Sequence, residues 1–307
     1  MKFALGTPAI INYPAIMSSW EPSATGADIV RIAQQADDLG WDWMTISEHV
    51  VIPNDMAGVM GRRFPDSLTA AAVLAGATRR IKFLTYVLVL PYRNPVVLAK
   101  SISTLDFLSG GRLGLGTGGG HLQKEFEAIG VSFADRGKLT DEYIRAMKEL
   151  WTSDNPSFDG QFVKFSGIAF EPKPVQKPHP PIFVGGNSKP AMRRAARFGD
   201  GWLPWLVTRE QLPGCLDYIR SQPGFDASKH FEVAMPMIIP NVEDYSHREL
   251  GATREPGNRE EILEEVGRMK EAGVTLVQVV PPKTASVSQA IEWIDWFARE
   301  IFPAFRR

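Results

Sequence analysis

The chain has 307 residues, of which 44% are hydrophobic and 22% charged, and this composition excludes an intrinsically disordered protein. Lys and Arg number 34 against 35 Asp and Glu, so the net charge of −1 offers no electrostatic basis for binding nucleic acid. A single cysteine, Cys215, excludes an intramolecular disulfide framework and a thiolate zinc site. No apolar run approaches the roughly 20 residues that span a bilayer, and no signal peptide is evident. We therefore expect a cytoplasmic protein with neither membrane nor nucleic acid as a partner.

Hydrophobic periodicity along the chain alternates between strands and amphipathic helices. The run 81–90 is continuous, apolar and rich in β-formers, which is typical of a strand covered on both faces. Four helices open on residues of N-cap type, namely Asp66, Asn94, Ser188 and Asn258. Strands are predicted at 2–6, 41–46, 81–90, 112–116, 182–185, 200–203, 231–239 and 274–280, and helices at 25–39, 67–77, 94–108, 137–151, 188–198, 209–221, 259–272 and 286–301.

Each of the eight predicted strands is followed by a helix. Parallel strands need crossovers of a dozen or more residues, and helices supply them. The pattern predicts an α/β fold, a (β/α)8 TIM barrel with loop insertions, as a single domain over residues 1–307. A doubly wound open sheet arises from the same alternation and is the main alternative. The predicted insertions are a short hairpin at 160–171 and an irregular polar segment at 240–257.

Two polar residues, Glu48 and His49, directly follow the second predicted strand. The active site of such a barrel lies at the C-terminal ends of its strands, and histidine is well suited to acid–base catalysis. A catalytic His49 beside Glu48 is one interpretation, and a structural histidine is the other. No two histidines have HxxxH spacing, and neither GxSxG nor GxxxxGK[ST] occurs, so no metal site, hydrolase triad or P-loop is predicted.

Two glycine-rich segments follow the fourth and fifth predicted strands. The segment 116–120 has two interpretations. Its glycines around Thr117 would let a flat ring system lie against bare backbone, or the segment is simply a flexible turn. After the fifth strand, two glycines precede a helix N-terminus, whose partial positive charge suits a phosphate group, although ordinary turn chemistry explains the same pattern. The candidate phosphate site consists of Gly185, Gly186, Asn187, Ser188 and Lys189, with Arg193 and Arg194 further along the helix.

Short motifs run in order through roughly the first 205 residues. They are ADDLGWD at 36–42, SEH at 47–49, RNP at 93–95, TLDFLSGGR at 104–112, GLGTG at 114–118, EFEAIG at 125–130, PPIFVGG at 180–186 and GDGW at 199–202. Together they resemble the bacterial luciferase-like monooxygenase superfamily, most closely its branch of oxidoreductases that use the deazaflavin coenzyme F-420. The resemblance implies a (β/α)8 barrel with the cofactor across its C-terminal mouth, in agreement with the count of strands.

The resemblance also implies roles for individual residues. Glu48 and His49 would lie beside the reactive ring, and Gly185, Gly186 and Asn187 would receive the phosphate. Ring contacts are implied for Thr117, Gly118 and Gly119, although Gly119 stands where some deazaflavin enzymes have an acidic residue. Members carry a non-prolyl cis peptide after the third strand. By position it maps to Tyr86–Val87, with Thr85–Tyr86 as the alternative, so Tyr86 and Val87 are expected to face the cofactor.

The leading interpretation is an oxidoreductase that transfers a hydride between coenzyme F-420 and an unidentified organic substrate. One alternative is an FMN-dependent monooxygenase that uses reduced flavin and oxygen in the same site. Another is a barrel that binds a flavin or deazaflavin without catalysis. The expected partner is a small-molecule substrate, and a homodimer is compatible with the resemblance. Residues 240–257 are expected to form a lid over the mouth, with 50–65 as the other candidate.

Overall fold

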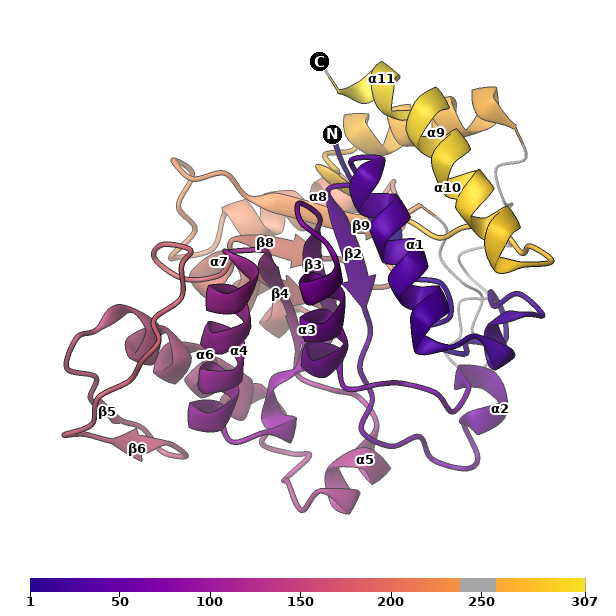
Figure 1. Ribbon diagram of the computed structural model, residues 1–307. Coiled ribbons are helices and arrows are strands. Elements are labelled where there is room, and N and C mark those ends of the chain that lie inside the picture. Colours follow the sequence, from indigo (N-terminus) through magenta and orange to yellow (C-terminus); the bar gives the residue numbers. More distant parts are fainter. Residues whose placement is uncertain (238–257, 307) are drawn as a thin grey trace.

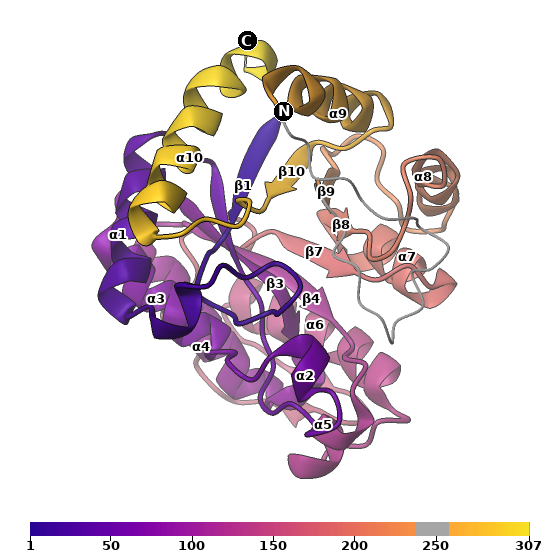
Figure 2. The same cartoon turned by 90° about the vertical axis from the view of Figure 1, so that its right-hand side faces the viewer.

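A computed structural model describes residues 1–237 and 258–306 of the chain. Eight parallel strands form a closed barrel in the order β1-β10-β9-β8-β7-β4-β3-β2, with helices packed around it (Figures 1 and 2). The predicted (β/α)8 fold is confirmed, and closure of the barrel excludes the open sheet. The barrel strands are β1 (Lys2–Gly6), β2 (Trp43–Ile46), β3 (Lys82–Val89), β4 (Leu113–Gly118), β7 (Ile182–Gly185), β8 (Gly201–Leu203), β9 (Glu232–Pro236) and β10 (Leu276–Val279).

The longer helices surround the barrel in chain order. They are α1 (Gly26–Asp38), α3 (Ser67–Ala77), α4 (Pro95–Ser109), α6 (Arg136–Thr152), α7 (Lys189–Phe198), α8 (Leu212–Arg220), α9 (Arg259–Glu271) and α10 (Val287–Glu300). Short helices are α2 (Ala57–Met60), α5 (Gln123–Ala128) and α11 (Phe302–Phe305), with 3-10 turns at Glu21–Ser23 and Leu90–Tyr92. Within the described residues, no helix is both long and apolar enough to cross a membrane.

The predicted helix starts are confirmed where a side chain caps the first turn. Asp66 accepts a hydrogen bond from the Thr69 amide, and Asn94 accepts one from the Val96 amide. Ser188 and Asn258 cap α7 and α9 in the same way. Each cap satisfies one or two of the N–H groups that a helix start leaves without an intrahelical partner.

The structure differs from the predicted elements at one strand end, at the hairpin and at two short helices. The fourth strand was expected to end at 116, but β4 continues to Gly118 because Thr117 and Gly118 pair with β3. The hairpin predicted at 160–171 is present but begins and ends earlier, since β5 (Phe158–Asp159) pairs antiparallel with β6 (Lys164–Phe165). Helices α2 and α5 were not expected, because four to six residues are too few to show a helical period. The candidate lid at 240–257 lies outside the described residues.

Apolar side chains form two layers, one inside the barrel and one between the barrel and its helices. The inner cluster consists of Ala4, Trp43, Leu84, Phe183, Leu203, Ala234 and Leu276, with Tyr86 and Val87 packed above it. The outer cluster is much larger and includes the outward-facing residues of the same strands. The interior below the mouth is therefore a packed core, as the barrel architecture requires, and functional groups are confined to the mouth.

A buried carboxylate joins the end of α1 to the start of β3. Asp37 is 4% exposed and accepts hydrogen bonds from the amides of Arg79 (2.8 Å), Arg80 (2.8 Å) and Ile81 (2.6 Å). Burial opposes ionisation of Asp37, but these three amide donors outweigh it and lower the pKa of the carboxyl group. The carboxylate thus fixes the turn between α3 and β3, whose backbone amides it satisfies.

We predict that Asp37→Asn lowers the free energy of unfolding at pH 7 by about 1–3 kcal/mol, because an amide N–H₂ group then faces the Arg79 amide. The lowered pKa means that the carboxylate stabilises the fold above the unfolded-state pKa and that this contribution disappears as the pH falls. The difference between the two proteins should therefore shrink below about pH 4. Urea unfolding across this range measures it.

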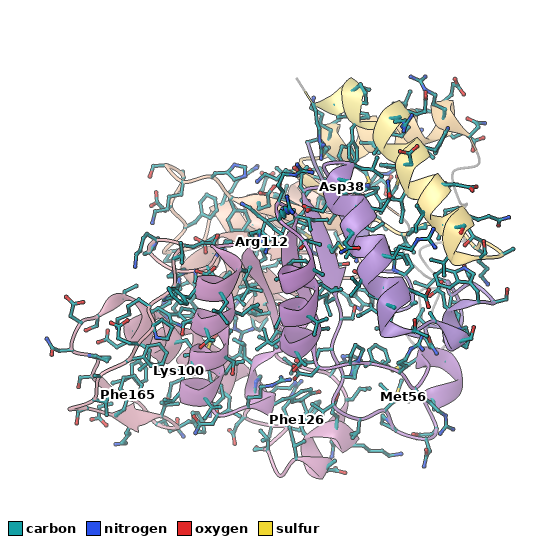
Figure 3. The ribbon with its side chains drawn as sticks, viewed as in Figure 1. Asp38, Met56, Lys100, Arg112, Phe126 and Phe165 are labelled. Carbon is teal, nitrogen blue, oxygen red and sulfur yellow. The ribbon has the colours of Figure 1, made fainter. Side chains whose placement is uncertain are left out.

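The matched control is Asp38→Asn. The Asp38 side chain is 78% exposed at the end of the same helix (Figure 3). Its substitution should change stability by less than about 0.5 kcal/mol at every pH. Equal effects at the two positions would contradict the role assigned to Asp37.

Candidate active site

The mouth of the barrel is shaped by a bulge at the end of β3. The pairing of β3 with β4 shifts register between Thr85 and Leu88, and the Tyr86–Val87 peptide bond is cis. The first of the two positions expected for this bond is thus confirmed. The bulge turns the side chains of Tyr86 and Val87 toward the axis of the barrel, above the inner apolar cluster.

Glycines on the two neighbouring strands make room for Val87. A Cβ atom built on Gly118 would lie 2.9 Å from Val87 Cγ2, and one built on Gly185 would lie 3.1 Å from Val87 Cγ1. At the first distance Val87 would have to shift, and at the second a neighbour would have to yield by a few tenths of an ångström. Val87 therefore packs against bare backbone that a side chain at Gly118 would disturb. Gly119 is different, because a Cβ there would meet Thr140 Oγ1 at an ordinary 3.5 Å.

Tyr86 carries a buried hydroxyl group. The oxygen has no hydrogen-bond partner among the described residues, and burial raises the pKa of the phenol well above its ordinary value. A buried polar atom that makes no hydrogen bond costs about 1–3 kcal/mol. The hydroxyl therefore remains a protonated donor with unused bonding capacity, available to a ligand or a water molecule.

His49 follows β2 and is held by a carboxylate from α5. Its Nδ1 lies 3.0 Å from Glu125 Oε2, and its side chain is 11% exposed. Tyr92 donates its hydroxyl to the same Glu125 oxygen, and the His121 and Phe64 rings lie nearly perpendicular to the imidazole. Burial opposes ionisation of Glu125, but the hydrogen bonds from His49 and Tyr92 outweigh it, so the pKa of Glu125 is lowered.

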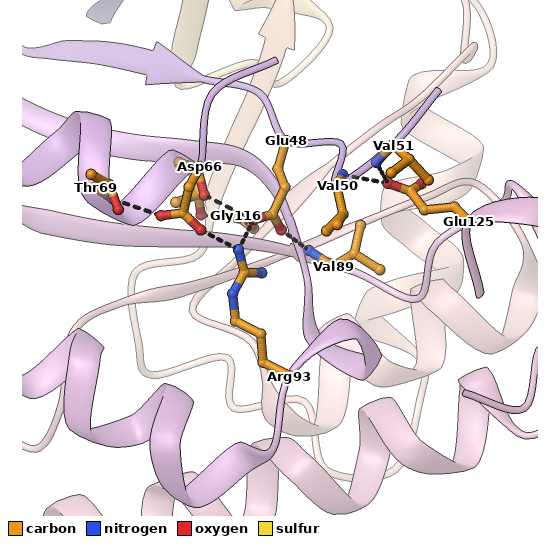
Figure 4. A network of polar contacts seen from close by, with 11 residues as sticks. Glu48, Val50, Val51, Asp66, Thr69, Val89, Arg93, Gly116 and Glu125 are labelled. Atoms are coloured by element: carbon orange, nitrogen blue, oxygen red, sulfur yellow. Dashed lines mark hydrogen bonds and ion pairs between the residues drawn. The ribbon is translucent and has the colours of Figure 1, made fainter. Parts of the chain in front are cut away.

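Glu48 points in a different direction from its neighbour. Its carboxylate accepts hydrogen bonds from the Val89 amide (3.0 Å) and from Arg93, which also pairs with Asp66 (Figure 4). The residue is 4% exposed, and burial raises the pKa of its carboxyl group against the opposing effect of Arg93. The structure thus gives Glu48 contacts that organise the loop behind the bulge, and its catalytic role stays a prediction.

The predicted phosphate site lies at the start of α7. Gly186 has a positive φ of 113°, and its carbonyl oxygen accepts a hydrogen bond from Trp202 Nε1 (2.7 Å). Asn187, Ser188 and Lys189 are exposed, which leaves this helix end open to a ligand. Gly185, Gly186 and these three residues are contiguous, and their contact with a phosphate stays a prediction.

The two arginines of α7 are engaged elsewhere. Arg194 pairs with Asp141 and donates to the Gly137 carbonyl oxygen (3.0 Å), and Arg193 donates to the Tyr218 hydroxyl (3.0 Å). Both arginines thus have protein partners in this structure, and their contact with a phosphate stays a prediction. Lys189 is the cation of the first turn, with its Nζ 5.9 Å from the centre of the Tyr218 ring.

Thr117 lies within β4 and is 1% exposed. Its hydroxyl donates to the Phe183 carbonyl oxygen at 3.4 Å, across the pairing of β4 with β7. The hydroxyl is thus committed to a neighbouring strand. Its predicted contact with a ring stays a prediction, as do those of Gly118 and Gly119 beside it.

A cavity of about 70 Å³ opens at the ends of β1, β2 and β10. Its polar lining includes Thr45, Ser47 and Gln278, and Gln278 donates to Thr45 Oγ1 (2.8 Å). Glu21 is the ionisable residue of this lining, and its two oxygens accept hydrogen bonds from the amides of Ala9 and Ser18. The cavity therefore combines apolar walls with a few hydroxyl and amide groups, and the one ionisable residue of its described lining is engaged by backbone amides.

Four residues of this mouth were not expected from the sequence, namely Glu125, Tyr92, Thr45 and Gln278. Glu125 belongs to the quoted motif EFEAIG, but its partner His49 is 76 positions away, and no local spacing reveals that pairing. In the part of the chain that the structure describes, no three His, Cys, Asp or Glu side chains gather as metal ligands.

Comparison with known proteins identifies the family of this chain. A family model described as luciferase-like monooxygenase matches residues 11–230. The FMNH(2)-dependent dimethylsulfone monooxygenase of Pseudomonas putida is 30% identical over 230 residues, which cover 69% of this chain and 62% of that protein. The chain thus spans about three fifths of the length of this relative.

Solved structures share the whole architecture. Monooxygenase RslO1 from Streptomyces bottropensis superposes with a TM-score of 0.79 at 22% identity, over 99% of this chain and 100% of that one. An F420-dependent secondary alcohol dehydrogenase, in complex with an F420-acetone adduct, gives 0.73 at 20% identity over 100% of both chains. At these identities the likeness establishes a common fold.

We predict that Gly118→Ala lowers the free energy of unfolding by about 1–3 kcal/mol, because the added methyl group overlaps Val87. Gly119→Ala is the matched control and should be nearly neutral, since its Cβ has an ordinary contact. Adding Val87→Ala to Gly118→Ala should recover most of the loss. Urea unfolding measures all three. Equal losses at Gly118 and Gly119 would contradict the inferred clash between a side chain at position 118 and Val87.

Proposed function

Because this chain belongs to the luciferase-like monooxygenase family, we propose that it is an oxidoreductase that binds a flavin or deazaflavin cofactor across the mouth of the barrel. One observation carries the proposal: His49, an acid–base group held by a buried carboxylate, stands at the same mouth as the glycine-lined bulge. A barrel that had kept the fold without chemistry would have no need to hold a histidine in this way.

The residues of the mouth fit such a cofactor. The Val87 bulge and the bare backbone of Gly118, Gly119 and Gly185 suit a flat ring system, and the Tyr86 hydroxyl is a buried donor without a partner among the described residues. Asn187, Ser188 and Lys189, with Gly186, would hold a phosphate at the start of α7. A bound flavin or deazaflavin supplies the hydride or electron chemistry that protein side chains lack.

We propose coenzyme F-420 as the cofactor and hydride transfer as the reaction. A hydride transfer to or from a carbon that bears oxygen needs a partner for the accompanying proton, and His49 is suited to take or supply it. An F420-dependent secondary alcohol dehydrogenase has the same fold. The second candidate is a monooxygenase that uses reduced FMN, and the 30% identity to an FMNH(2)-dependent dimethylsulfone monooxygenase favours it.

The proposed substrate is a small neutral molecule with an oxygen atom. The 70 Å³ cavity beside Ser47 has space for a few non-hydrogen atoms, and its hydroxyl and amide groups suit a carbonyl, hydroxyl or sulfonyl oxygen. Among the described residues, its lining contains no lysine, arginine or histidine, so a carboxylate substrate would be desolvated without a counter-charge.

The test is a titration of the purified protein with F-420 and, separately, with oxidised and reduced FMN, followed by absorbance and fluorescence. Tight binding of F-420, with FMN weaker by about tenfold or more, supports the leading candidate. The reverse preference favours the monooxygenase. Binding of neither cofactor would overturn the proposal.

We predict that Asn187→Asp weakens cofactor binding by about tenfold or more at low ionic strength, because it adds a negative charge of the same shape beside the proposed phosphate site. The loss should diminish as salt screens the repulsion. Asn155→Asp, in the loop after α6, makes the same chemical change at another exposed asparagine and should leave the dissociation constant unchanged. Equal dissociation constants for wild type and Asn187→Asp would show that the phosphate does not bind beside Asn187.

We predict that His49→Ala lowers kcat about 10²–10⁴-fold with any accepted substrate and changes cofactor affinity little, because the proposed ring and phosphate contacts remain. His230→Ala, which removes an imidazole that is 66% exposed, is the control and should keep full activity. Turnover by His49→Ala at the wild-type rate would show that His49 has a structural role and no catalytic one.

A further inference from the structure

Glu125 is a carboxylate enclosed by hydrogen-bond donors. It is 0% exposed near the start of α5, and its two oxygens have separate sets of partners. Oε1 accepts from the amides of Val50 and Val51, and Oε2 accepts from His49 Nδ1 and the Tyr92 hydroxyl (Figure 4 shows the amide contacts). Four donors converge on one buried group that has no exposed surface of its own.

The protonation state of this group follows from its partners. The pKa of Glu125 is lowered, since the hydrogen bonds outweigh the effect of burial, so the carboxylate is ionised near neutral pH. An ionised carboxylate only accepts hydrogen bonds. The contact at 3.0 Å therefore requires the proton of a neutral His49 to reside on Nδ1, and the lone pair to reside on Nε2.

We propose that Glu125 is the positioning residue of the site, which fixes His49 in the tautomer with its lone pair on Nε2 and stabilises the imidazolium that forms when Nε2 takes a proton. This inference rests on the proposed function, in which His49 is the acid–base group. When a substrate O–H bond breaks, the proton forms an N–H bond at Nε2, and the positive charge of the ring faces the negative charge of Glu125 at 3.0 Å. In the reverse direction the same N–H bond supplies the proton.

The surroundings of His49 support this assignment. Phe64 and His121 meet the imidazole edge to face, with ring centres 4.7 and 5.7 Å away, and no hydrogen bond to Nε2 is found among the described residues. Besides Glu125, the ionisable side chain that contacts the His49 ring is His121. The Glu48 carboxylate faces Arg93 instead. Glu125 is thus the hydrogen-bonding partner that sets the tautomer.

The substitution Glu125→Gln gives a sharp test because the two oxygens have different partners. The amides of Val50 and Val51 both need an acceptor, so the carbonyl oxygen of the new side-chain amide must take the place of Oε1. The N–H₂ group of that amide then faces His49 and donates to Nδ1. The imidazole must therefore change to the tautomer with its proton on Nε2, while the shape of the site is kept.

The first measurement is the tautomer of His49 in ¹⁵N-labelled protein without cofactor, from long-range proton–nitrogen correlation spectra at neutral pH. His49→Ala identifies the signals. We expect the lone pair on Nε2 in wild type and on Nδ1 in Glu125→Gln. Tyr92→Phe keeps the carboxylate and should keep the wild-type tautomer. Glu127→Gln, an exposed position on the same helix, is the matched control and should also keep it.

The second measurement is turnover. With the wrong tautomer, Glu125→Gln should lower kcat about 10²–10⁴-fold with a small effect on KM, as a carboxylate-to-amide change beside a catalytic histidine does elsewhere. A lone pair on Nδ1 in wild type, or an unchanged tautomer in Glu125→Gln, would overturn the role of Glu125 whatever the activity. The expected tautomers together with full turnover by His49→Ala would instead overturn the proposed function.

Discussion

The buried ion pair between Glu48 and Arg93 is the contact on which the mouth of this barrel depends. Glu48 receives the amide of Val89 directly after the bulge of β3, and Arg93 extends the pair to Asp66, the N-cap of α3. Arg93 also directly precedes the N-cap of α4. One cluster of charges therefore fixes the end of β2, the exit of the bulge and the starts of two helices.

The energetics of such a cluster are asymmetric. Two charges taken out of water lose their hydration, so an intact buried pair adds little net stability, but removal of one partner leaves the other uncompensated at a cost of about 3–5 kcal/mol. The Glu48 side chain is 1% exposed and the Arg93 side chain 23%, so this asymmetry applies with most force to Arg93 substitutions, which would leave the carboxylate buried. The pair therefore specifies one arrangement of the mouth more than it stabilises the fold.

Adjacent residues on the loop after β2 have different partners because they point in different directions. Glu48 meets a cation, Arg93, whereas His49 meets a second carboxylate, Glu125. The sequence predicted the location of this pair at a strand end, because the position follows from local periodicity. It could not predict the two sets of contacts, because each depends on a partner 45 or 76 positions away.

Separation along the chain also explains which other features could be predicted from the sequence. The order of strands and the helix caps follow from residues within a few positions of one another, and these predictions hold, whereas the position of the bulge came from the family resemblance. Asp106 of the motif TLDFLSGGR is fully buried and accepts hydrogen bonds from Gln176, 70 positions away. Thr45 and Gln278 meet across the closure of the barrel, 233 positions apart, and only the fold brings them together.

Charge balance at the start of α7 constrains how the proposed phosphate could be recognised. Arg194 is paired with Asp141, and Arg193 donates to Tyr218, so α7 would offer a phosphate its backbone amides, the Ser188 hydroxyl and Lys189. A helix N-terminus acts within its first turn, and its field decays beyond that. Recognition at this end would therefore reach one phosphate group and little further. FMN and coenzyme F-420 have similar three-ring systems and each carries a phosphate, so a phosphate site at the start of α7 would not by itself distinguish them. Discrimination between them would have to come from contacts beyond the first turn of α7 and from the groups that meet the ring.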